Sequence, residues 1–178
     1  MKLTRLLTFS LLICLVFPIL ASADQYDDAE KAIKDKDYKK ACELLKPLAD
    51  ENNLGAMTLL GTYYYNGLGV EKDVAKGLAL IMKAANQEYA PAKAVAVTVN
   101  RELAVIGDTS AMYNVGIMCL NGWGGEQDPK ECIQWIEKAA ENGHVKSAKA
   151  LSRIYADGKF KITPDKEKAS YWSNLAQK

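Results

Sequence analysis

Few side chains in this sequence have a type and spacing that could support catalysis. His144 is the only histidine, and a Ser-His-Asp or Cys-His nucleophile, or a metal site with two histidines, cannot be built from it alone. The acidic residues Asp27, Asp28 and Glu30 lie near the start of a predicted helix, where carboxylates interact favourably with the helix dipole. We therefore predict that His144 is an exposed turn residue, and we predict no catalytic, cofactor-binding or metal-binding residue.

The glycine-rich segment 122–125, Gly-Trp-Gly-Gly, could be taken for a phosphate-binding loop. Such a loop follows a strand and precedes Lys-Ser/Thr, and the sequence offers neither feature. The overall charge indicates no class of partner, because the sequence has 23 Lys and Arg and 22 Asp and Glu. Without a basic excess we predict no nucleic-acid partner.

Residues 1–23 have the composition of a cleaved secretory signal. They begin with two basic residues, continue through the uncharged stretch 6–20 and end in the small residues Ala-Ser-Ala. A membrane-spanning helix needs roughly 20 apolar residues, so an uncleaved anchor is the less favoured alternative. Cleavage after Ala23 would leave 155 of the 178 residues. We expect this mature chain to be periplasmic or secreted, with no membrane span.

A repeat organises the rest of the chain. The segment 56–69, AMTLLGTYYYNGLG, aligns with 111–124, AMYNVGIMCLNGWG, and an Asp follows the first Gly by 12 positions in both copies. Apolar residues at i, i+3, i+4 and i+7 and an Asp at the start of each second half predict two antiparallel helices per copy. The predicted units are a cleaved leader (1–23) and a repeat domain (24–178) made of an amino-terminal helical pair (24–53), a repeat (54–89), a truncated repeat (90–109), a repeat (110–145) and a variant last repeat (146–178).

The truncated repeat raises a geometric problem. A single helix there would place the start of the next repeat at the opposite end of the stack, because only a pair of antiparallel helices returns the chain to its starting end. We therefore predict two short helices, over about 90–99 and 101–106.

These residues closely resemble the Sel-like repeat family, a branch of the tetratricopeptide-like helical solenoids. Its pattern is roughly A-x4-G-x2-Y-x2-G-x-G-V, then D-x2-K-A-x2-W and K-A-A. The matching positions are Ala56, Gly61, Tyr64, Gly67, Gly69, Val70, Asp73 and 83–85, then Ala111, Gly116, Gly122, Gly124, Asp128, Trp135 and 138–140, then Tyr155, Gly158, Lys168, Ala169 and Trp172. The departures are Cys119 in a Tyr slot and Cys132 and Gly77 in Ala slots.

The resemblance implies an all-α fold, a right-handed α-α superhelix or solenoid, acting as a monomeric scaffold without cofactors. The implied function is an adaptor or regulator of a bacterial envelope process that binds a protein or peptide on its concave face. An immunity-type inhibitor that sequesters a toxin is the alternative within that class. A cell-wall hydrolase is the alternative from another class, and it would need paired carboxylates that the sequence does not show.

Analogy with tetratricopeptide grooves indicates which side chains line the concave face. They are first-helix residues three before, one after and four after the Gly slot of each repeat. Those residues are Thr58, Thr62, Tyr65, Tyr113, Ile117, Leu120, Lys149 and Arg153.

Removal of the leader leaves three cysteines, Cys42, Cys119 and Cys132. Cys119 and Cys132 lie in one repeat at positions expected to face each other. A disulfide between them could stabilise the fold by about 3 kcal/mol. Two small buried thiols are the equal alternative. In either case Cys42 is expected to be unpaired.

Overall fold

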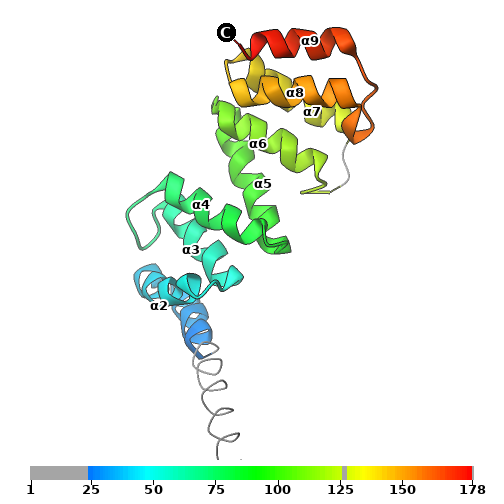
Figure 1. Ribbon diagram of the computed structural model, residues 1–178. Helices are drawn as coiled ribbons and strands as arrows, with labels where there is room; N and C mark the ends of the chain where they lie inside the picture. Colours follow the sequence, from blue (N-terminus) through cyan, green and yellow to red (C-terminus); the bar gives the residue numbers. More distant parts are fainter. Residues whose placement is uncertain (1–23, 126–127, 178) are drawn as a thin grey trace, which may run out of the picture. The chain divides into compact units, whose positions relative to one another are not determined.

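The computed structural model describes residues 24–125 and 128–177, and the predicted leader lies outside them. The described part is helical without a strand (Figure 1), which confirms the all-α prediction. No helix among these residues is both long and apolar enough to cross a bilayer. The helices cover residues 24–34, α2 (Tyr38–Asp50), α3 (Leu54–Asn66), α4 (Val74–Ala85), α5 (Ala90–Val105), α6 (Thr109–Leu120), α7 (Pro129–Glu141), α8 (Val145–Asp157) and α9 (Lys166–Leu175), with a 3-10 turn at Lys159–Lys161.

Asp and Asn side chains mark where most of these helices begin. Each accepts a hydrogen bond from a backbone amide in the first turn and so satisfies a donor that has no partner within the helix. The capping residues are Asp37, Asn53, Asp73, Asp108, Asp128 and Asp165. The cap predicted at Asp73 is confirmed, with 2.9 Å between its Oδ1 and the Lys76 amide nitrogen.

Substitution of Asp73 by alanine should lower the free energy of unfolding by about 1 kcal/mol, because the amide of Lys76 loses its acceptor. Glu71→Ala removes the same charge from an exposed position two residues earlier. It should change the free energy by less than about 0.5 kcal/mol. Urea unfolding of the two variants measures the difference, and equal midpoints would show that the cap contributes nothing.

The chain forms two compact units, divided between Ala92 and Lys93. In the first unit, α3 and α4 pack together where each carries a glycine. A Cβ atom on Gly61 would lie 2.8 Å from the Gly77 carbonyl oxygen, and a Cβ on Gly77 would lie 2.6 Å from the Gly61 carbonyl oxygen. The two backbones are therefore in contact, and a side chain at either glycine would force the helices apart.

The two loop glycines after α3 have separate roles. Gly67 ends α3 with a φ of 75° and donates its amide to the Tyr63 carbonyl oxygen, a left-handed conformation that favours glycine. A Cβ on Gly69 would collide with the backbone of Tyr38. The loop thus packs against the start of α2 only because Gly69 has no side chain.

The second unit pairs α6 with α7 and α8 with α9. Its largest buried cluster takes side chains from the last three of these helices. Gly116 lies against α7, since a Cβ there would collide with the Ile136 side chain. The cluster consists of Ile133, Ile136, Ala140, Ala148, Leu151, Ile154, Tyr155 and Trp172.

The prediction of two short helices in the truncated repeat is wrong. Residues Ala90–Val105 form one helix, α5. Asn100, near the expected break, is only 1% exposed, and its Nδ2 donates to the Ala96 carbonyl oxygen at 2.8 Å. Its Oδ1 accepts from Asn114 Nδ2 at 3.0 Å. Since both polar ends of the amide are satisfied, the helix continues through this position.

Candidate protein-binding surface

The first unit offers little of the predicted surface. Thr58 is buried, and its hydroxyl donates to the Leu54 carbonyl oxygen at 2.7 Å. The Thr62 hydroxyl donates to the Thr58 carbonyl oxygen at 2.9 Å. Both hydroxyls are thus hydrogen-bonded to the backbone of α3, and Thr58 is too buried to contact a partner. Tyr65 is half-buried.

In the second unit, the three predicted residues of α6 are half-buried. Tyr113, Ile117 and Leu120 all pack against the large core cluster. The Tyr113 ring lies 5.3 Å from the His144 ring, measured between centroids, and 4.9 Å from the Lys146 amine. These three side chains therefore contribute mainly to packing and present only part of their surface.

The prediction that His144 is an exposed turn residue is only partly right. It does precede α8, but it is half-buried. Its Nδ1 lies 2.7 Å from the buried Ser147 Oγ. Burial, together with the neighbouring Lys146 amine, lowers the pKa of His144. The ring thus joins the turn to α8 and packs on Tyr113.

Lys149 and Arg153 are the exposed members of the predicted set. They stand one turn apart on α8 and border a depression of about 280 Å³ between α8 and α9. The remaining walls are Ser152, Ser173, Ala176 and Gln177. Two cations, two hydroxyls and an amide form a polar recess with hydrogen-bond donors on several sides.

A larger cavity of about 500 Å³ lies beside the starts of α7 and α9 and was not predicted. At its wall the Tyr155 hydroxyl donates to Glu137 Oε1 at 2.9 Å, and the Lys168 amine lies 4.9 Å from the Tyr155 ring. Burial, with this hydrogen bond and the carboxylate charge, raises the pKa of Tyr155 to about 12. Tyr155 was visible in the sequence as a repeat position, but nothing there indicated Glu137 as its partner.

The phenol of Tyr155 should titrate well above the ordinary tyrosine value of about 10. Because the folded pKa is raised, the associated stability is present below pH 10 and is lost as the pH rises towards 12. Glu137→Gln removes the carboxylate charge and should lower the pKa of Tyr155. Tyrosinate absorbance against pH, with the curve of Tyr155→Phe subtracted to isolate this phenol among the 9 tyrosines, checks this, and an unchanged titration would refute it.

The position of Cys119 shows how the second complete repeat, residues 110–145, departs from the first and the last. In the first complete repeat the Lys76 amine donates to the Tyr64 hydroxyl at 2.8 Å, and in the last repeat Lys168 lies over Tyr155. In the second complete repeat, Cys119 stands at the position of that tyrosine.

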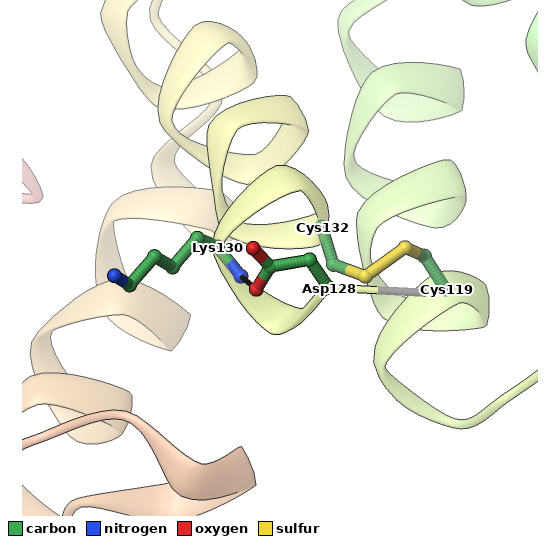
Figure 2. The surroundings of a disulfide bond; sticks show 4 residues. All are labelled: Cys119, Asp128, Lys130 and Cys132. Atoms are coloured by element: carbon green, nitrogen blue, oxygen red, sulfur yellow. Dashed lines mark hydrogen bonds between the residues drawn. A yellow bond between two sulfur atoms is a disulfide. The ribbon is translucent and has the colours of Figure 1, made fainter. Parts of the chain in front are cut away.

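Cys119 forms a disulfide with Cys132, with 5.5 Å between the Cα atoms. Figure 2 shows this bond joining α6 to the first turn of α7, next to the cap formed by Asp128. Of the two alternatives for these cysteines, the structure has the disulfide. Cys42 is a free, buried thiol. A covalent link thus stands where the other two repeats use a tyrosine–lysine contact.

Three solved structures resemble this chain at low identity. A protective antigen of uropathogenic Escherichia coli with an SLR fold is 20% identical, with a TM-score of 0.44, covering 88% of this chain and 38% of that chain. The chain thus spans less than half of that antigen's length. A Sel1 repeat protein from Oxalobacter formigenes is 23% identical, with a TM-score of 0.40, covering 88% and 87%. Protein 5086 of Pseudomonas aeruginosa is 17% identical, with a TM-score of 0.40, covering 88% and 81%.

The sequence model of the Sel1 repeat matches four segments, residues 28–53, 55–89, 109–144 and 145–176. The first covers the amino-terminal helical pair, and the other three cover the helix pairs α3–α4, α6–α7 and α8–α9. Helix α5 lies between two matched segments. Because the matches cover well over half of its residues, the chain belongs to the Sel1 repeat family.

Proposed function

We propose that this protein is a non-enzymatic protein-binding module of the bacterial envelope, an adaptor or regulator that binds its partner through first-helix surfaces. Sel1 repeat proteins are commonly protein–protein interaction modules and typically non-enzymatic scaffolds. Stacked helix pairs bury a continuous core and leave one row of helices for a partner. The observation that carries the proposal is the exposed pair Lys149 and Arg153 on the first helix of the last repeat.

Two features support an exported location. Residues 1–23 have the pattern of a cleaved secretory signal. The disulfide between Cys119 and Cys132 is typical of proteins that fold in an oxidising compartment, since cytosolic thiols are kept reduced. Both fit a mature chain that begins at Asp24 and works in the periplasm or outside the cell. The mass of the chain purified from its native host checks the cleavage point.

Affinity capture tests the binding function. The mature chain, immobilised in its oxidised form, is exposed to periplasmic extract, and a thermally unfolded sample of the same chain serves as the control. We expect one protein to be retained by the folded chain alone and to form a complex of fixed stoichiometry after purification. Retention of the same proteins by both samples would contradict the proposal.

A further inference from the structure

The cations of α8 lie on one helix face. Lys146, Lys149 and Arg153 are spaced i, i+3 and i+7, which places them on a single side; we call them the basic row. All three are exposed. Lys146 lies over the Tyr113 ring, whereas Lys149 and Arg153 have no hydrogen-bond or ion-pair partner among the residues that the structure describes. Their charge is free to meet a ligand.

Among the described residues of α6, α8 and the α9 segment 169–175, no acidic side chain pairs with the basic row. The acidic residue of α8, Asp157, pairs with Lys159 at 3.2 Å. Helix α6 carries no charged residue, and neither does the α9 segment 169–175. Asp108, before α6, is engaged as a cap through the Ala111 amide at 2.7 Å. The surface around Lys149 and Arg153 is therefore locally positive although the whole chain is nearly neutral.

The surroundings of the basic row indicate the chemistry of its ligand. The depression of about 280 Å³ next to Lys149 and Arg153 adds the hydroxyls of Ser152 and Ser173. Guanidinium, ammonium and hydroxyl groups together suit a carboxylate, which the guanidinium can bind through two parallel hydrogen bonds. On the neighbouring α6, the half-buried side chains of Tyr113, Ile117 and Leu120 supply apolar surface.

We propose that the basic row and the adjoining depression bind an acidic segment of a protein partner. Carboxylates of that segment lie against Lys149 and Arg153, and its apolar side chains lie over the exposed parts of α6. This assignment rests on the protein-binding function proposed above and gives the partner's chemistry. A peptide fits this recess better than a flat anionic membrane does, because the polar groups line a concavity.

A defined probe tests the assignment directly. The probe is a fluorescein-labelled peptide of glutamate and leucine, and its counterpart has lysine in place of every glutamate. By fluorescence anisotropy, we expect the folded chain to bind the acidic peptide only, and more weakly as salt shortens the Debye length. Lys149→Glu with Arg153→Glu should weaken this binding by at least about tenfold.

The control is a double variant, Lys130→Glu with Lys166→Glu. It makes the same change in net charge at exposed positions on α7 and α9 that do not line the depression, and it should bind the acidic peptide as the unaltered chain does. Three results would overturn the assignment: equal binding by both double variants, equal binding of the lysine peptide, or binding to phosphatidylglycerol vesicles in place of the acidic peptide.

Partner capture separates this inference from the function on which it rests. If the native partner is retained, competition by the acidic peptide and loss on charge reversal of Lys149 and Arg153 are the expected results. Retention that neither treatment reduces would overturn the acidic-segment assignment and leave the protein-binding function standing. Failure of the unaltered chain to retain any partner would overturn the function itself.

Discussion

Replacing Gly61 with leucine is expected to lower the free energy of unfolding by about 1–3 kcal/mol. Any side chain at this position meets the Gly77 carbonyl oxygen and the Ile81 side chain at 2.8 Å, and the first of these is backbone that cannot rotate away. Helices α3 and α4 must separate to admit it, which opens their shared core. Thermal and urea unfolding of the purified chain measure the loss.

The smaller substitution Gly61→Ala tests the same contact through the sign of its change in the free energy of unfolding. Alanine in a helix interior normally stabilises by about 0.5–1 kcal/mol relative to glycine, so a destabilising Gly61→Ala isolates the collision from helix propensity. Ala79→Leu is the matched control, because it adds bulk to an exposed position of α4. A stabilising Gly61→Ala, or an equal loss in Ala79→Leu, would show that the two backbones do not pack as described.

Removal of the disulfide between Cys119 and Cys132 is expected to cost about 3 kcal/mol, the entropy gained by an unfolded chain when a 13-residue link is released. The double variant Cys119→Ala, Cys132→Ala should therefore unfold at a lower temperature than the unaltered chain. Reductant should lower the melting temperature of the unaltered chain and leave that of the double variant unchanged.

Cys42→Ala is the control for this experiment. Because Cys42 is a free thiol, this variant should keep the full response to reductant. Mass spectrometry of a non-reduced digest should show the peptides of Cys119 and Cys132 linked. Free thiols at both positions would remove the disulfide from the account.

The helical fold could be predicted because its signals are local. The cap at Asp73 and the glycines at 61 and 67 each act on neighbouring residues or within one helix pair, so the repeat pattern was enough to place them. The single helix α5 could not be predicted in the same way. The buried amide of Asn100 is satisfied in part by Asn114, which lies 14 positions away in another helix.

The binding surface was predicted less well than the fold. Register places Thr58 and Lys149 at equivalent positions of their repeats, yet Thr58 is buried and Lys149 is exposed. The difference arises from what packs against each helix, which register does not specify. The pair Tyr155 and Glu137 was missed for a related reason, since the acid belongs to the preceding repeat and to no recurrent motif.

Site-specific photo-cross-linking on the native partner tests most directly whether the protein works by binding through its first-helix side. A photoreactive amino acid is introduced in place of Ser152, which lines the depression on α8 and leaves both cations in place, and, in a second chain, in place of the exposed Lys130 on α7. We predict that illumination in periplasmic extract links one partner protein to the chain modified at Ser152 and none to the chain modified at Lys130. Cross-linking from Lys130 alone, or the same products from both positions, would contradict the account.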